Sequence, residues 1–323
     1  MLNIKKILLP VDFPNTSLRV VHQAATLANH FHSEIVMLHV VTTESNAAGV
    51  PENDPELAGW DMLAEIVRGA QKNLDLSLEA ELESLAVRRV LLKGDPVQAI
   101  LQTAQVEKAD LIMMPSHGYT FNAFLLGSVT AKVLHGSACP VWTGAHVEEP
   151  AWSSEASNPQ LLYGGVGTGK TRPMQAIGPE VKQRPPVQEF AIHNVLCAVD
   201  LGPRSEAAVS WAALMATKFG SRLTLAHVTP SVEIWGPGGR YVDQRWKEEL
   251  VGDASQRIAK LQQDMGIKAD VLIGSGDVPK VLSQAAKQTK ADLVVTGCYP
   301  YGGNLRIHGY AIICAVPIPV LSV

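Results

Sequence analysis

An internal repeat constrains the fold of this 323-residue chain more than any other feature. The segment Ile7–Asp12 returns as Val195–Asp200, an offset of 188 from residue 7 to residue 195. At this offset the same residue recurs at Ser17 and Ser205, Ala24 and Ala212, Phe31 and Phe219, and His39 and His227. Further along, Gly94–Asp95 returns as Gly276–Asp277, where the offset is 182 from residue 94 to residue 276. This period is too long for a solenoid, so we expect one domain present twice, each copy large enough for its own core.

Apolar runs and helical spacings alternate along each copy. In the first copy the pattern predicts strands at 4–11, 34–41, 87–93, 110–114 and from 140, and helices from Ser17, over about 56–84, from Pro96 and from Gly127. The second copy keeps strands at 195, 222, 270 and 292. Asp95 and Pro96 have the cap and first-turn identities that open a helix. Five strands joined by helical crossovers predict an α/β fold, with two tandem doubly wound domains, each built on a five-stranded parallel sheet.

The loop after strand 110–114 is the strongest indication of a binding site. It contains His117 and Gly118, and the helix behind it begins with Gly127–Ser128. The first amides of a helix lack intrahelical partners and carry the positive end of its dipole, and glycine lets an anion approach the backbone. Ligands of doubly wound sheets bind beyond the carboxyl ends of the strands, where this loop, Asp12 and Val40 are expected to meet. The pattern predicts a phosphate site.

The same segment resembles the nucleotide loop of the universal stress protein family (UspA-type domains). The family pattern is Gly, two residues, Gly, nine residues, then Gly-Ser or Gly-Thr, and Gly118, Gly127 and Ser128 match it. The chain departs from the pattern twice: Pro115 stands at the first glycine, and 8 residues separate Gly118 from Gly127. Proline cannot take the left-handed conformations that are open to glycine, and this weighs against phosphate binding.

The resemblance implies a Rossmann-like, UspA/HUP-type fold and a role in the stress response. It implies that the first copy binds ATP or a related adenine nucleotide, with or without Mg²⁺, and acts through nucleotide-dependent signalling or an unknown protein partner. It implies that Pro10 and Asp12 line the base and ribose pocket, that Val40 presents its backbone to adenine, and that Gly118, Gly127, Ser128 and Val129 hold phosphates, with Val11 and Met114 in the same site. An aspartate there can accept from a ribose hydroxyl, whereas its alternative role is to cap the following helix.

Three histidines are open to a catalytic interpretation. His117 lies in the loop but has no serine or carboxylate partner in sequence, so we interpret it as structural. His39 and His227 lie in apolar strands and are interpreted as hydrogen-bonded core residues. The sequence shows no catalytic base, nucleophile pair or metal cluster, and we expect slow ATP hydrolysis at most.

The second copy is predicted to have lost the site. At the offset of 182, Pro300 replaces Gly118 (118 to 300), Tyr299 replaces His117, and Gly309–Tyr310 replaces Gly127–Ser128. Pro317 and Pro319 also predict a shortened helix behind that loop. We therefore expect one nucleotide per chain.

Between the copies the chain is polar and rich in glycine and proline. This divides it into a nucleotide-binding domain at 1–146, a flexible linker at 147–190 and a second domain with a degenerate site at 191–323. Gly164–Thr171 in the linker matches the Walker A pattern in full. A working P-loop needs a strand before it and a helix after it, and the prolines and glycines that follow forbid such a helix. We interpret the match as part of the linker.

The charge and the cysteine content limit which partners and which compartment we expect. A net charge of −4 gives no basic field for nucleic acid, and four scattered cysteines without Cys-x-x-Cys spacing fit a reducing compartment. We expect no signal peptide and no membrane span, and therefore a cytoplasmic protein. The apolar final strands, Pro140–Thr143 and Pro319–Val323, would be exposed edges, so we expect them to join the copies as an internal pseudo-dimer, with or without a homodimer.

Two other function classes stay open. One is a nucleotide-independent interaction or scaffold protein, which the change at Pro115 favours. The other is an enzyme, either a P-loop NTPase that uses Lys170 or an adenylate-forming relative on the same fold.

Overall fold

The structure is a computed structural model that describes residues 2–13, 17–42, 62–116, 126–144, 190–203, 205–231, 233–236, 239–242, 244–297 and 305–323. Within these ranges only the backbone is described at 62–63, 233–242 and 305–308. The predictions for His117, Gly118, the Walker A match, Tyr299 and Pro300 fall outside the described residues.

The first half of the described chain contains a five-stranded parallel sheet. Its strands are β1 (Lys6–Pro10), β2 (Glu34–Val41), β3 (Val87–Lys93), β4 (Leu111–Met114) and β5 (Val141–Thr143), in the order β3-β2-β1-β4-β5. Every neighbouring pair within this half is parallel. The prediction of a doubly wound parallel sheet is confirmed.

Local capping explains where the helices of this half begin. They are α1 (Leu18–Phe31), α2 (Met62–Leu76), α3 (Pro96–Glu107) and α4 (Ser128–Gly136). The Ser17 side chain caps α1, and the Asp95 carboxylate accepts from the Gln98 amide at 2.8 Å at the start of α3. The predicted helix over 56–84 was too long at its C-terminal end. The helix ends at Leu76, because Leu78 adopts a left-handed φ of 60° that a helix cannot continue through.

The second half repeats this order and adds one hairpin. Its elements are β6 (Asn194–Ala198), α5 (Ser205–Phe219), β7 (Arg222–Thr229), β8 (Glu233–Gly236), β9 (Gly239–Val242), α6 (Gln244–Met265), β10 (Asp270–Ser275), α7 (Val278–Thr289), β11 (Leu293–Thr296), α8 (Leu305–Ala315) and β12 (Val320–Ser322). The β8–β9 hairpin forms a separate two-stranded sheet that sequence patterning did not predict.

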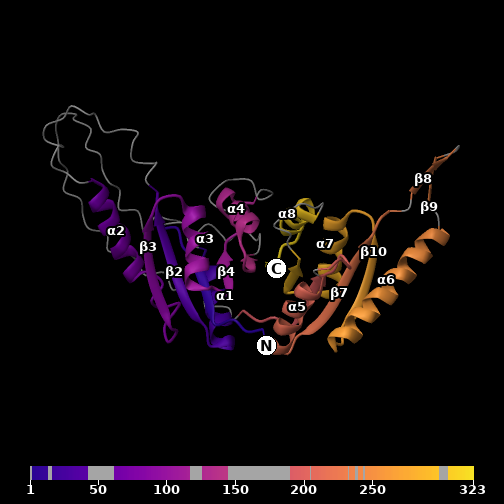
Figure 1. The fold of residues 1–323 in the computed structure, drawn as a ribbon, viewed down its shortest axis with the longest axis horizontal. Helices are drawn as coiled ribbons and strands as arrows, with labels where there is room; N and C mark the ends of the chain where they lie inside the picture. Colours follow the sequence, from indigo (N-terminus) through magenta and orange to yellow (C-terminus); the bar gives the residue numbers. More distant parts are fainter. Residues whose placement is uncertain are drawn as a thin grey trace, which may run out of the picture. The chain divides into compact units, whose positions relative to one another are not determined.

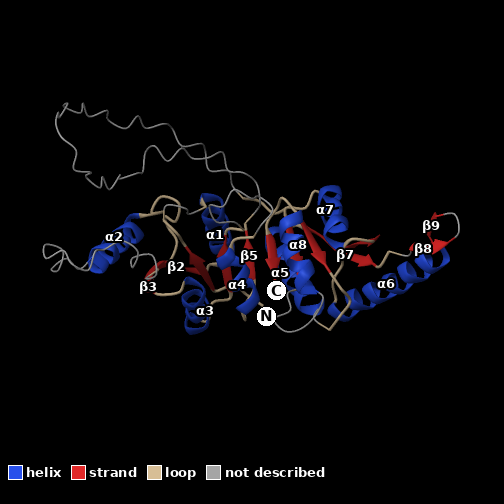
Figure 2. Cartoon of the chain, turned by 90° about the horizontal axis from the view of Figure 1, so that it is seen from above, coloured by secondary structure: helices blue, strands red, loops and turns tan. Residues whose placement is uncertain are grey.

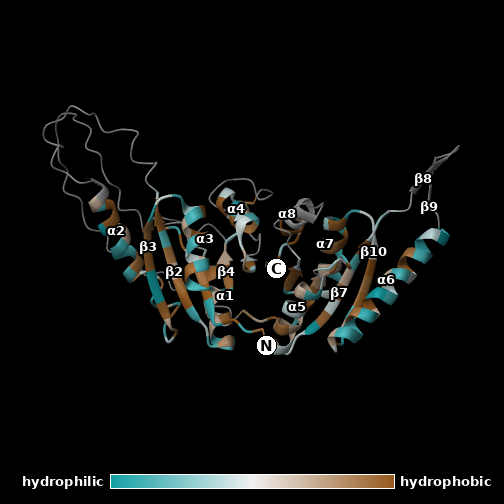
Figure 3. Ribbon diagram, in the orientation of Figure 1, coloured by the Kyte–Doolittle hydropathy of each residue, from teal (hydrophilic) through white to brown (hydrophobic). Residues whose placement is uncertain are grey.

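Helices cover both faces of the sheet (Figure 1). One apolar cluster takes buried residues from α1, α2, α5 and α6, and the other from α3, α4, α7 and α8. Apolar residues concentrate on the strands, whereas α2 and α6 carry many hydrophilic residues on their outer surfaces (Figure 3). This distribution is typical of a sheet whose two faces are both buried.

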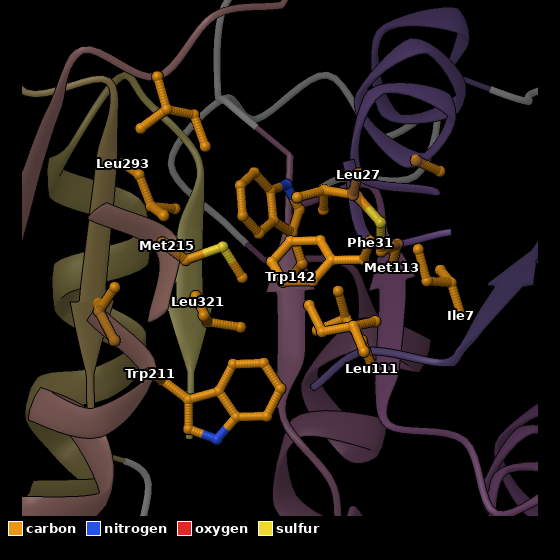
Figure 4. Packing of buried hydrophobic residues seen from close by; sticks show 14 of the residues in the cluster. Ile7, Leu27, Phe31, Leu111, Met113, Trp142, Trp211, Met215, Leu293 and Leu321 are labelled. Atoms are coloured by element: carbon orange, nitrogen blue, oxygen red, sulfur yellow. The ribbon is translucent and has the colours of Figure 1, made fainter. Parts of the chain in front are cut away.

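The two halves join through their last strands. Strands β5 and β12 pair antiparallel, with Trp142 opposite Leu321, so the described strands of both halves, apart from β8 and β9, form one ten-stranded sheet. Figure 2 shows β5 between β2 of the first half and β7 of the second. Figure 4 shows Trp142, Met215 and Leu321 in the space where the halves meet. The predicted pairing of these two edges is confirmed.

The last helix of the second half corrects two predictions. Helix α8 has 11 residues and α4 has 9, so the helix in the second half is not shortened. The prolines follow the helix and leave it intact. Counting back from the helix ends at Ala315 and Gly136 aligns Tyr310 with Ala131, and not with Ser128 as the sequence offset suggested.

Candidate functional site

The candidate site lies at the switch point of the first half. The chain proceeds from β1 to β2 and β3 on one side, and then to β4 and β5 on the other. Parallel pairing of β1 with both β2 and β4 brings Pro10 and Met114, the last residues of β1 and β4, to the same edge. A crevice between strands of this kind is where doubly wound sheets bind ligands.

The turn after β1 is held by β2. The Val11 amide donates to the Leu38 carbonyl at 2.8 Å, and the His39 Nδ1 lies 2.9 Å from the Val11 carbonyl oxygen. Val11 is buried, Val40 is half-buried and Asp12 is exposed. The turn therefore presents the Asp12 side chain at the surface of the candidate site, while hydrogen bonds to β2 fix the backbone at Val11.

His39 has an equivalent in the second half. The His227 Nδ1 lies 2.8 Å from the Val199 carbonyl oxygen, which repeats the contact between His39 and Val11. The predicted hydrogen bonds of both histidines are confirmed, but both side chains are half-buried and not in the core as expected. A ring nitrogen that faces a carbonyl carries the proton, so Nδ1 is the donor in each case.

Two hydrogen bonds connect the start of α4 to the end of β4. The Gly127 amide donates to the Ser116 carbonyl at 2.9 Å, and the Thr130 hydroxyl donates to the Pro115 carbonyl at 3.0 Å. Sequence reasoning missed Ser116 and Thr130 in this role, although a hydroxyl in the first turn of a helix is a usable signal. The backbone at Pro115 is not in the left-handed region, as the proline ring requires.

The amino end of α4 has no side-chain cap from the part of the chain that the structure describes. Gly127 is the N-cap residue. The amides of Ser128, Val129 and Thr130 occupy the first turn, where a helix has no internal acceptors for them. Ser128 is exposed and Val129 is half-buried. These three amides and the helix dipole are suited to an anion.

The equivalent edge of the second half is formed by the turn after β6 and the start of α8. The Asp200 carboxylate, at the position of Asp12, accepts from the Gly202 amide at 2.9 Å and from the Ser205 hydroxyl at 2.8 Å. Helix α8 begins at Leu305, so Arg306, which aligns with Gly127, lies inside the helix and not at its cap.

The main charge network lies at the other edge of the sheet, where the strands begin. Lys6 contacts Glu107 at 3.1 Å, and Arg88 contacts both Glu34 at 3.1 Å and Glu107. The hydrogen bond from Arg88 and then that from Lys6 lower the pKa of Glu107. Because the network is at the amino ends of β1, β2 and β3, we interpret it as structural.

The described cysteines have thiols whose pKa values are raised by burial. Burial raises the pKa of the Cys197 thiol, and burial is also the largest cause of the raised pKa of Cys139. Such thiols are poor nucleophiles. Among the described residues no group of three or more His, Cys, Asp or Glu side chains could hold a metal ion. None of the described helices is able to span a membrane.

The fold defines the chain as a doubly wound α/β protein, a class in which the switch point is the usual place for a ligand. The model of the Universal stress protein family matches residues 3–143 and 191–307. This chain therefore belongs to the universal stress protein family, as a tandem member with two family domains.

Individual relatives agree with this assignment. Universal stress protein MJ0531 of Methanocaldococcus jannaschii is 31% identical over 140 residues, which are 42% of this chain and 79% of the relative. Universal stress protein MJ0577 of the same organism is 28% identical over 151 residues, 42% of this chain and 92% of the relative. The crystal structure of a universal stress protein from Archaeoglobus fulgidus covers 100% of this chain and 97% of its own, with a TM-score of 0.62 and 20% identity. That last similarity concerns the fold.

Proposed function

We propose that the first half binds an adenine nucleotide, ATP or a close relative, and that this binding governs a stress-response role through an unidentified protein partner. The base and ribose lie beside Pro10, Val11, Asp12 and Val40, and the phosphates lie at the amino end of α4. The observation that supports the proposal is the first turn of α4 at Ser128, Val129 and Thr130, which no described side chain caps, beside the switch point between β1 and β4.

The second half acts as a scaffold in this proposal. Its helix α8 lacks a glycine cap at the matching position, because Arg306, which aligns with Gly127, lies inside that helix. We therefore propose a stoichiometry of one nucleotide per chain.

Calorimetric titration with ATP tests the site. Ser128→Tyr places a bulky ring at the amino end of α4, and we expect it to abolish binding because the phosphates can no longer reach the amides. The matched control is Ser255→Tyr, an exposed serine on α6 of the second half, which should bind as the unmodified protein does. Two equivalent sites per chain, or binding that survives Ser128→Tyr, would contradict the proposal.

A nucleotide-independent interaction protein is the second candidate. Pro115, in place of the family glycine, favours it, because proline has no amide to donate to a phosphate. Mass spectrometry of small molecules released from the purified protein distinguishes the two: a bound adenine nucleotide supports the first candidate. For an enzyme that uses the Walker A match, ATPase activity would have to disappear in Lys170→Ala.

A further inference from the structure

Helix α8 of the second half reaches helix α4 of the first half. The Tyr310 hydroxyl donates to the Ala131 carbonyl oxygen at 2.5 Å. Tyr310 and Ala131 hold equivalent places, because each lies five residues before the end of its helix, at Ala315 and Gly136. Ala131 also closes the first turn of α4, since its amide donates to the Gly127 carbonyl at 2.8 Å.

A second contact joins α8 to the residue before the helix cap. The Leu126 backbone amide hydrogen-bonds to the Cys314 sulfur, which lowers the pKa of that thiol, while burial has the larger effect and raises it. Cys314 follows Tyr310 by one helical turn, so both residues lie on the same face of α8. This face therefore contacts Leu126, immediately before Gly127, and Ala131, one turn after it.

Apolar packing surrounds these two polar contacts. Val133 and Leu134 of α4 share one buried cluster with Ile312 and Ile313 of α8, and Leu126 packs against the same cluster. A helix of 9 residues is marginal by itself, because most of its stability comes from packing in the tertiary structure. The position of α4 is thus set from two sides, by its bonds to Pro115 and Ser116 in its own half and by α8 of the other half.

We propose that Tyr310 is a positioning residue of the second half for the phosphate site of the first half. This inference rests on the proposed function. A phosphate must lie within hydrogen-bond reach of the Ser128–Thr130 amides, and such sites lose strength when their supporting contacts loosen by fractions of an ångström. By holding Ala131, Tyr310 fixes the turn that carries those amides. By linkage, phosphate bound at α4 strengthens the contact between the two halves by the same factor.

The test compares a ligand with phosphates and a ligand without them. Tyr310→Phe keeps the ring and removes the hydroxyl. We expect ATP to bind about three- to tenfold more weakly, the range for one lost hydrogen bond. We expect the affinity for adenosine to stay unchanged, because adenosine does not reach α4. A merely structural weakening of the first half would lower both affinities together, so equal losses, or no loss for ATP, would overturn the inference.

The matched control removes a hydroxyl-to-carbonyl bond that does not reach α4. The Ser283 hydroxyl donates to the Ala315 carbonyl at 2.9 Å, at the other end of α8 and within the second half. Ser283→Ala should therefore leave the affinities for both ATP and adenosine unchanged. A loss of ATP affinity as large as that of Tyr310→Phe would show that any loosening of α8 has the same effect, and would overturn the role given to Tyr310.

Hydrogen exchange of the unliganded protein separates this inference from the proposed function. Tyr310→Phe should speed exchange of the α4 amides from Lys132 to Gly136 several-fold, while Ser283→Ala should not. If the unmodified protein binds neither ATP nor adenosine, the proposed function fails, and the exchange data alone decide whether Tyr310 holds α4. Unchanged exchange in Tyr310→Phe would overturn that contact as a support of the helix.

Discussion

Gly94 and Gly276 occupy equivalent positions, one after β3 and one after β10, and both have positive φ. The angles are 127° and 118°, and each amide donates at 3.0 Å to the neighbouring strand, to Val41 and Thr229 respectively. A Cβ at Gly94 would meet no atom within 4 Å, so only the backbone conformation requires glycine there. Residues with side chains rarely adopt this conformation.

Because the space around Gly94 is open, a substitution there measures the effect of the φ angle alone. We expect Gly94→Ala to lower the free energy of unfolding by about 1–3 kcal/mol, the cost of a residue held in a sparsely populated conformation. The measurement is the shift of the urea unfolding midpoint. The control is Gly69→Ala, an exposed position inside α2 with equally open space, which should gain about 0.5–1 kcal/mol. Equal and small effects of the two changes would contradict the strain argument.

One ion pair is retained between the halves with its charges exchanged. In the first half Glu34 of β2 contacts Arg88 of β3 at 3.1 Å, and in the second Arg222 of β7 contacts Asp270 of β10 at 3.3 Å. Exposed pairs of this kind contribute at most about 1 kcal/mol each. The exchange indicates that the two positions need opposite charges across neighbouring strands, and that either order satisfies them.

At the scale of elements, α1 and β5 are joined by a buried hydrogen bond. The Trp142 indole N–H donates to the Gln23 Oε1 at 2.9 Å, with Gln23 only 2% exposed and Trp142 fully buried. Phe190 packs edge-on against the Trp142 ring, with the ring centroids 6.0 Å apart. This bond fixes how α1 lies over the strand that joins the two halves.

A double-mutant cycle measures that bond. Gln23→Leu leaves a buried indole N–H without an acceptor, and we expect a loss of about 1–3 kcal/mol in the free energy of unfolding. Combining Trp142→Phe with Gln23→Leu removes the unpaired donor. The double variant should therefore lose less free energy of unfolding than the two single variants together, with a coupling of about 0.5–3 kcal/mol. Gln102→Leu, at an exposed position on α3, is the control and should be additive with Trp142→Phe. Additivity in the Gln23 cycle as well would contradict the hydrogen bond.

Most elements could be predicted because their signals are local. The strand at 34–41 and the Asp95 cap follow from short apolar runs and from a side chain that bonds its own helix, and both are present. The alignment of Tyr310 could not be predicted, because the offset between the copies changes again after residue 296 and only the pairing of β5 with β12 shows the register. The bonds from Ser116 and Thr130 depend on tertiary position, which periodicity does not encode.

At the scale of the whole molecule, the segment between the halves should be dispensable for binding. We expect ATP affinity to change less than tenfold, about 1.4 kcal/mol, when residues 150–185 are replaced by a flexible polar linker of equal length. The reason is that every predicted contact with the nucleotide comes from the first half. Calorimetry provides the measurement, and Lys170→Ala in the native linker is the matched control. A greater loss of ATP affinity in either variant would indicate that the Walker A match contributes to nucleotide binding.

The pairing of β5 with β12 has a consequence for how this chain can change over generations. Trp142 faces Leu321, and Tyr310 meets Ala131, so equivalent positions of the two copies meet each other and carry different residues. In a dimer of two identical subunits, each such substitution would be present in both subunits, so that Trp would face Trp or Tyr would face Tyr across the interface. Fusion in one gene lets a mutation fall on one side only, and selection can then enlarge one residue and reduce its counterpart independently.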